Sequence, residues 1–185
     1  MDASGFKDLI KPIADAVAGR PVEAALGEFL NREFPPDGGT FKAIGRAGHE
    51  AVAVGGMCAR QAGGIAFGRA IEPDAALHGF SVDVVRMEDV KGPHHSHPLG
   101  EIDMVMPLTP GAAFDGQGAG WKVYGPGTAH HPTVSCGAAL VTYLLPEARI
   151  AFTSWGWLRA DRRAGLPALD GPTASNKFAA VSAPP

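Results

Sequence analysis

The apolar residues at the start of the chain recur with the period of an α-helix. One helix face would carry Phe6, Leu9, Ile10, Ile13 and Val17. Gly19 is a stop signal, and Pro21 is suited to the first turn of a second helix. The apolar face of that second helix would carry Val22, Leu26, Phe29 and Leu30. Residues 34–39 hold two prolines and two glycines and end it, so we predict a helical segment over residues 1–39.

From residue 40 to about residue 153, short apolar runs separated by glycines favour strands. Val52 and Val54 alternate with alanines, and residues 80–87 alternate most clearly between apolar and polar side chains. Residues 102–108 and 138–145 are apolar runs bounded by proline, which suits buried strands. Several short strands with turn signals between them predict a barrel or sandwich.

Composition supports a mainly β fold with many tight turns. The 185 residues include 25 glycines and 16 prolines, while 45% of them are hydrophobic, which is enough for a real core. We therefore expect one domain, a small β-barrel or jelly roll over residues 40–153 that carries the helical segment. Residues 154–185 are rich in Pro, Ala, Gly and Ser and are expected to form a C-terminal extension.

Charge and hydropathy exclude several classes of protein. The formal net charge is −3 and the basic residues do not cluster, so we expect no nucleic-acid partner. The N-terminus carries acidic residues, and no stretch approaches the roughly 18 apolar residues of a membrane-spanning helix, so we expect neither a signal peptide nor a membrane anchor. Cys58 and Cys136 are too few for a disulfide framework, which favours a cytoplasmic protein.

Histidines provide the strongest chemical signal, because five of the seven fall in residues 92–101 and 125–132. Side chains two residues apart on a strand point to the same side, so His95 and His97 can converge on one point. Glu101 follows a Pro-Leu-Gly bend that could return its carboxylate there. His94 has the opposite parity and should point away. A fourth ligand is expected from the second segment, in which two histidines are adjacent.

These segments resemble the two motifs of metal-dependent cupins. His95-x-His97-x-x-x-Glu101 is similar to the first motif, and Gly127-x-x-His130 is similar to the core of the second. The resemblance implies that His130, rather than His131, completes the ligand set. Three imidazoles and one carboxylate suit a divalent Fe, Mn, Zn, Ni or Co ion and leave coordination positions free for water or substrate.

A wider stretch resembles the 4-hydroxylaminobenzoate lyase family of nitroaromatic degradation. The resemblance covers roughly residues 5–153 and includes GPHHSHPLGEIDMVMPL, FDGQGAGWKVYGPGTAHHPTV and ALVTYLLPEARIAF. It implies a lyase that converts 4-hydroxylaminobenzoate to 3,4-dihydroxybenzoate and releases ammonia. The N–O bond is then the internal oxidant, so no external redox cofactor is needed, and a metal can act on that bond as a Lewis acid.

Such a reaction needs proton transfer and a site for an aromatic carboxylate. Three side chains near the motifs are candidates for the general acid or base: His131, Tyr124 and Glu101. Four cations are candidate anchors for the substrate carboxylate, although exposed surface charge is the better explanation for any single one of them: Arg46, Arg69, Arg86 and Lys122. Trp121 could stack on the substrate ring or pack in the barrel. We expect Met104 and Met106 to be core or wall residues.

Two other functions remain open at this point. One is another metal-dependent cupin enzyme, such as a dioxygenase or isomerase that acts on a small aromatic or organic acid. The other is a non-catalytic cupin that binds a small molecule. His49 and His78 lie outside the clusters and are expected to be structural or surface residues. Small barrels often pair through an exposed sheet edge, so we expect a homodimer.

Overall fold

The computed structural model describes residues 3–53 and 55–153. Three α-helices come first, and all the β-strands follow them. The helices are α1 (Ala3–Val17), α2 (Ala24–Glu33) and α3 (Gly39–Ala53). The strands are β1 (Arg60–Ala62), β2 (Ile65–Ile71), β3 (Phe80–Lys91), β4 (His95–His97), β5 (Glu101–Pro107), β6 (Ala113–Phe114), β7 (Gly120–Tyr124), β8 (Thr128–His130), β9 (Thr133–Pro146) and β10 (Ala151–Phe152), with a 3-10 turn, η1 (Ala75–Leu77), between β2 and β3.

The two predicted N-terminal helices are present, but the second begins at Ala24, so Pro21 and Val22 precede it instead of forming its first turn. In α1 the side chains of Phe6, Ile10 and Ile13 are fully buried, while Leu9 is half-buried at the edge of the same stripe. Helix α2 packs on β7, and Gly27 lies on its buried side, facing Val123. In both helices, the spacing of the apolar residues along the sequence therefore indicates which face is buried.

Residues 39–53 correct the expectation that strands begin at residue 40. They form α3, whose buried side comprises Phe41, Ile44, Ala47, Gly48 and Ala51. Their spacing is helical, but small residues at three of these positions weaken the apolar contrast that marks a helix face. The alternation at Val52 reflects the end of this helix, and the described strands begin at Arg60. The expected extension over residues 154–185 lies outside the described residues.

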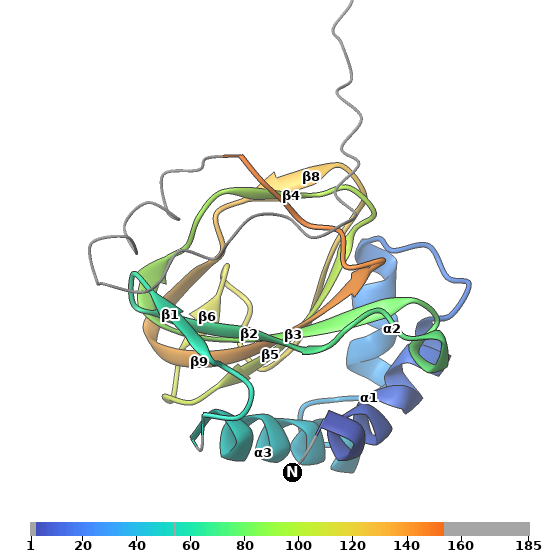
Figure 1. Ribbon diagram of the computed structural model, residues 1–185, viewed down its shortest axis with the longest axis horizontal. Helices are drawn as coiled ribbons and strands as arrows, with labels where there is room; N and C mark the ends of the chain where they lie inside the picture. Colours follow the sequence, from blue (N-terminus) through green and yellow to red (C-terminus); the bar gives the residue numbers. More distant parts are fainter. Residues whose placement is uncertain (1–2, 54, 154–185) are drawn as a thin grey trace, which may run out of the picture.

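The strands form two antiparallel sheets that face one another, as in a cupin (Figure 1). The larger sheet has the order β1-β2-β3-β9-β5-β7, with β6 paired to β9, and the smaller has the order β10-β4-β8. The long pairing of β3 with β9 runs from Phe80 opposite Pro146 to Lys91 opposite Thr133. The predicted strand 80–87 is therefore the start of the longest pairing in the described sheets. The fold is mainly β with an N-terminal helical segment, as expected.

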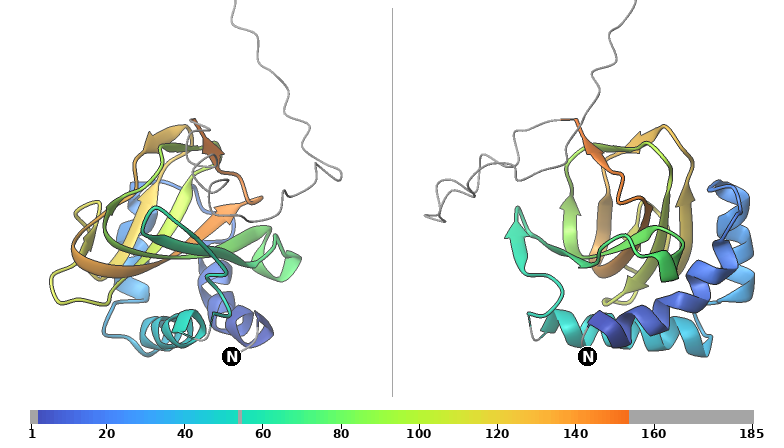
Figure 2. Two further views of the ribbon diagram at one scale, coloured as in Figure 1. Left: turned by 60° about the vertical axis from the view of Figure 1, so that its left-hand side comes forward. Right: turned by 45° about the vertical axis from the view of Figure 1, so that its right-hand side comes forward.

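The larger sheet buries both of its faces, and strand alternation assigns each residue to one of them. The outer face packs against the helices, which lie along one side of the sheet (Figure 2). Its core includes Val82, Val84, Ile102, Met104 and Leu144. The inner face is turned toward the smaller sheet. Its core includes Met87, Val105, Phe114, Val141 and Tyr143.

Among the described helices, none is long and apolar enough to cross a membrane.

Candidate metal centre

Three strands bring four potential ligands to one point between the two sheets. His95 and His97 both come from β4, Glu101 opens β5, and His130 closes β8. Strands β4 and β8 pair with His95 directly opposite His130. The chain returns from β4 to β5 through Gly100, which has a φ of 90° and would place a Cβ 2.6 Å from Val22. Glycine is therefore required where the turn delivers Glu101.

The ligand atoms of these four side chains lie within 4.8 Å of one another. His130 Nε2 is 3.1 Å from His95 Nε2, and His97 Nε2 is 3.3 Å from Glu101 Oε1. His97 and Glu101 are fully buried, His95 is 3% exposed and His130 is half-buried. The structure thus brings together the four residues that the sequence singled out, in a geometry that can hold one divalent metal ion.

The electrostatics of the cluster fit a bound cation. His97 Nε2 and both carboxylate oxygens of Glu101 are buried and have no hydrogen-bond partner among the described residues. Burial raises the pKa of Glu101 to about 8, because the charged carboxylate lacks compensation there. Burial, followed by the neighbouring histidines, lowers the pKa of His95 to about 3. Its imidazole is therefore neutral near pH 7, which is the form that ligates metal.

The Nε2 atom of each imidazole faces the cluster, and a hydrogen bond at Nδ1 orients the ring. His95 Nδ1 lies 3.2 Å from the carbonyl oxygen of Pro93, which can only accept. His97 Nδ1 lies 3.0 Å from Thr128 Oγ1, whose own proton is directed to the carbonyl oxygen of Gly125. Both contacts favour a proton on Nδ1 and leave the Nε2 lone pair directed at the centre, as in known metal-ligating histidines.

Asp115 makes the corresponding contact to His130 and was not anticipated from the sequence. Its Oδ2 lies 2.5 Å from His130 Nδ1 and accepts a hydrogen bond of 2.6 Å from the hydroxyl of Tyr124. Its Oδ1 accepts from the backbone N–H of Thr133. Burial alone would raise the pKa of Asp115, but these hydrogen bonds hold it below its usual value. In the sequence, Asp115-Gly116 is only an ordinary turn signal.

Asp103 is a second unanticipated carboxyl group. It follows Glu101 by two residues on β5, so both point to the inner face. It is fully buried and has no hydrogen-bond partner among the described residues. Burial and the nearby Glu101 raise its pKa well above the ordinary value. An apolar run in the sequence surrounds this aspartate, and nothing local marks it as part of a site.

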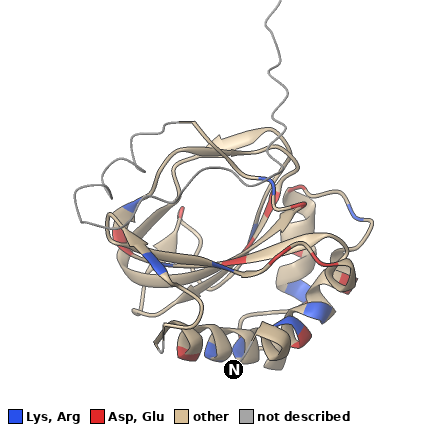
Figure 3. Ribbon diagram, viewed as in Figure 1, with Lys and Arg blue, Asp and Glu red and all other residues tan. Residues whose placement is uncertain are grey.

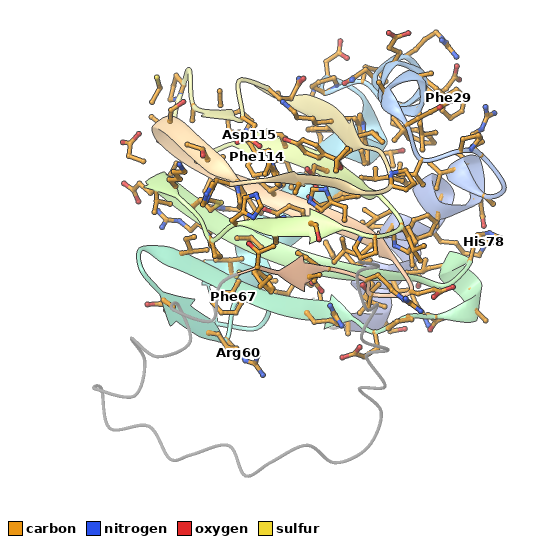
Figure 4. All side chains as sticks on the ribbon, turned by 90° about the horizontal axis from the view of Figure 1, so that it is seen from above. Phe29, Arg60, Phe67, His78, Phe114 and Asp115 are labelled. Atoms are coloured by element: carbon orange, nitrogen blue, oxygen red, sulfur yellow. The ribbon has the colours of Figure 1, made fainter. Side chains whose placement is uncertain are left out.

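The remaining histidines lie outside the cluster. His131 is exposed, with Nδ1 3.0 Å from the carbonyl oxygen of Gly92, and its ring lies 4.9 Å from that of His94. His94 contacts Thr153 through Nδ1. His49 is exposed on α3. His78 is also exposed, pairs with Asp15 and lies away from Asp115 in Figure 4.

The candidates for general acid–base chemistry therefore occupy different places. Glu101 belongs to the cluster itself. The Tyr124 ring centroid lies 4.3 Å from that of His130 and 5.2 Å from that of His97. His131 is not among the clustered ligand residues and contacts the carbonyl oxygen of Gly92, and its expected catalytic role stays a prediction.

Trp121 does not lie on the inner face of the sheet, where the ligand cluster is found. It lies on the outer face of the larger sheet and is 1% exposed. Its indole N–H donates to the carbonyl oxygen of Phe34, and its ring meets Phe41 edge to face. The packing alternative for Trp121 is the correct one, and the stacking alternative is wrong. Met104 lies on the same face and is core, as expected.

The four candidate carboxylate anchors are also spread over the molecule, and the basic residues gather on no single face (Figure 3). Arg46 is exposed on α3. Arg86 lies opposite Leu140 of the outer-face core and pairs with Glu88. The other two, Arg69 and Lys122, belong to the inner face, because they lie opposite Asp83 and Asp103, which share that face with Tyr143.

Comparison with known proteins decides the family. The family model described as 4-hydroxylaminobenzoate lyase matches residues 8–152. This chain belongs to the 4-hydroxylaminobenzoate lyase family. A family member from Pseudomonas putida is 32% identical over 162 residues, which span 78% of this chain and 90% of that protein. Another from Nocardioides sp. (strain LMS-CY) is 29% identical over 150 residues, spanning 76% and 89% of the two chains.

Among solved structures, a protein with a cupin-like fold from Ralstonia eutropha matches with a TM-score of 0.36 and 17% identity. The match covers 60% of this chain and 84% of that chain. At this degree of similarity, the cupin assignment rests on the two facing sheets and the ligand cluster described above.

Proposed function

We propose that this protein converts 4-hydroxylaminobenzoate and water to 3,4-dihydroxybenzoate and ammonia. The observation that carries the proposal is family membership over residues 8–152 together with the buried cluster of three histidines and Glu101. The matches to the two lyases span 90% and 89% of those proteins. We therefore assign the whole activity to this one domain. The reaction balances without an external oxidant, because cleavage of the N–O bond takes up the electrons that ring hydroxylation releases.

We propose His95, His97, Glu101 and His130 as ligands of one divalent metal, chosen from Fe, Mn, Zn, Ni and Co. A bound metal of this kind supplies Lewis acidity toward the hydroxylamino group. The protein contributes the orientation of the ligands. Thr128 and the carbonyl oxygen of Pro93 fix two of the imidazole rings, and Asp115 fixes the third.

Tyr124 is the proton-carrying side chain outside the ligand set that lies closest to this chemistry among our candidates. Its ring contacts those of His97 and His130, and its hydroxyl donates to Asp115. Burial and the Asp115 hydrogen bond raise the pKa of the phenol, which therefore keeps its proton. We propose that Tyr124 forms one wall of the substrate site and that its hydroxyl holds Asp115 in position.

The test is incubation of the purified metal-loaded protein with 4-hydroxylaminobenzoate under nitrogen, without nicotinamide, followed by assays for ammonia and 3,4-dihydroxybenzoate. Equal amounts of both products support the proposal. A His97→Ala protein serves as the inactive control, and His94→Ala as the matched histidine substitution outside the cluster. Turnover that requires O₂, or the absence of ammonia, would contradict the lyase reaction and favour a dioxygenase or a binding protein.

Two further expectations remain proposals. We propose a homodimer, which light scattering of the purified protein tests. We also propose a cytoplasmic location, which agrees with the unpaired state of Cys58 and Cys136 and with a small aromatic carboxylate as substrate. Fractionation of cells that make the protein tests this location.

A further inference from the structure

The inner face of the sheet continues from the ligand cluster along β7. Glu101 of β5 lies opposite Tyr124 of β7, and Asp103 lies opposite Lys122. Residues directly opposite on antiparallel strands share a face, so Tyr124 and Lys122 both project to the inner side of the sheet. Along β7, the inward-facing side chain that follows Tyr124 in the direction away from the cluster is therefore that of Lys122.

Lys122 has hydrogen-bonding capacity that the protein does not use. Its Nζ donates a hydrogen bond of 2.6 Å to the backbone carbonyl of Asp115 and lies 5.5 Å from the centroid of the Tyr124 ring. An ammonium has three donors, so two remain available. In the described part of the chain, no carboxylate oxygen lies within 4.0 Å of this nitrogen, although the side chain is half-buried.

Each of the other three candidate anchors is either paired with a carboxylate or located away from the inner face. Arg69 shares the inner face, but Asp83 binds its guanidinium through both carboxylate oxygens, at 2.7 and 3.1 Å. Arg86 pairs with Glu88 and is turned away from the inner face. Arg46 lies on α3, on the far side of the sheet. Lys122 faces the buried Asp103 across the strands but forms no ion pair with it within 4.0 Å. Among these four cations, it is therefore the inner-face one that has no carboxylate in direct contact within the described residues.

Tyr124 connects this cation to the ligand cluster. Its ring contacts the imidazoles of His97 and His130 and also the ammonium of Lys122. The two substituents of a para-disubstituted benzene point in opposite directions. Such a ring placed against Tyr124 directs one substituent to the histidines and the other to Lys122. The order of groups along the inner face thus matches the order of groups in a 4-substituted benzoate.

We infer that Lys122 binds the carboxylate of the aromatic substrate, while the para nitrogen faces His95, His97, Glu101 and His130. This inference rests on the proposed function, because that function supplies the para-substituted benzoate. It makes Lys122 a residue that determines specificity: it selects ring compounds with a carboxylate opposite the reacting nitrogen. The two free N–H groups of Lys122 and the partly water-excluded setting favour a charge-assisted hydrogen bond.

The experiment compares the wild-type protein with Lys122→Met, Lys122→Arg and, as a matched control, Lys42→Met, which removes an exposed lysine from α3. Calorimetry measures binding of 4-aminobenzoate, which resembles the substrate but lacks the N–O bond, and of aniline, which lacks the carboxylate. Metal content is measured on every sample. We expect Lys122→Met to weaken 4-aminobenzoate binding roughly 10- to 100-fold, with little change for aniline. Lys122→Arg should recover most of the affinity, and Lys42→Met should match wild type.

A parallel comparison of kcat/KM for 4-hydroxylaminobenzoate and N-phenylhydroxylamine separates anchoring from a structural role. Loss of a carboxylate anchor lowers the first value and spares the second. Equal losses on both compounds would overturn the inference, because they would mean that Lys122 only supports Asp115. Equal binding of 4-aminobenzoate and aniline by the wild type would also overturn it. If ammonia is not released but 4-aminobenzoate binds in a Lys122-dependent way, the proposed function fails and the anchor stands.

Discussion

His130 and Asp115 are joined by a hydrogen bond of 2.5 Å between the imidazole Nδ1 and a carboxylate oxygen, across a separation of 15 residues. The opposite nitrogen of the same ring faces His95 and Glu101. The carboxylate therefore determines which nitrogen of His130 is available to a metal, and it does so from a turn outside the two histidine segments. This relationship leads to the first of four predictions.

Asp115→Asn should reduce metal affinity about 10- to 100-fold, because the substitution removes the negative charge that makes His130 a stronger ligand. Asparagine tolerates the left-handed backbone of Asp115, which has a φ of 46°, so the turn should persist. The measurement is competition with a chelator at fixed pH. Asp89→Asn is the control. Asp89 also has a positive φ, at 42°, but it lies on the surface, where its side chain accepts a hydrogen bond from the backbone N–H of Gly137. Equal metal affinity in the two variants would contradict the assigned role.

Substitution of any one cluster residue by alanine should remove most of the metal, since three remaining groups do not complete the site. The four variants are His95→Ala, His97→Ala, Glu101→Ala and His130→Ala. Elemental analysis of each folded protein gives the stoichiometry, and activity should fall in parallel.

The two histidines outside the cluster provide the matched controls for the ligand set. His94→Ala and His131→Ala should keep one metal per chain, because neither histidine belongs to the group of clustered ligand atoms. A metal-free His131→Ala beside a fully loaded His130→Ala would show that the ligand is the neighbouring histidine. Full metal in both His95→Ala and His97→Ala would rule out this site.

Helix α1 contributes to stability through a narrow stripe. Ile13 is fully buried, so Ile13→Ala should lower the free energy of unfolding by about 2–5 kcal/mol, from lost burial plus the cavity left behind. Leu9 is half-buried, and Leu9→Ala should cost clearly less. Urea denaturation of both variants measures the difference. A change below about 0.5 kcal/mol for Ile13→Ala would mean that this helix does not pack on the sheet in solution.

The two cysteines should differ in reactivity. Burial raises the pKa of Cys58 to about 11, so little thiolate is present at pH 8, and the thiol also donates to the carbonyl oxygen of Val84. Cys136 is exposed. Brief treatment with iodoacetamide should give one adduct, on Cys136, by mass spectrometry, and two adducts after denaturation. Modification of both cysteines at the same rate in the folded protein would contradict the burial of Cys58.

Local patterns in the sequence determine several parts of this molecule. Phe6, Ile10 and Ile13 define a helix face because their spacing depends only on the helical period. In the same way, His95 and His97 point to one side because side chains alternate along a strand. Where the side chains are small, as at Ala47 and Gly48, the pattern loses contrast and does not distinguish this helix from a strand.

The tertiary structure decides which side of each strand is the inside. Alternation places Trp121 and Lys122 on opposite faces of β7. Only the packing of the helices shows that Trp121 lies on the outer face, beneath them, and that Lys122 lies on the inner face, which is turned toward the smaller sheet. Asp115 meets His130 because β6 pairs with the start of β9, with Phe114 opposite Val134, and β9 begins three residues after His130. Contacts of this kind depend on which distant segments pair, and neither a helical nor a strand period within one segment carries that information.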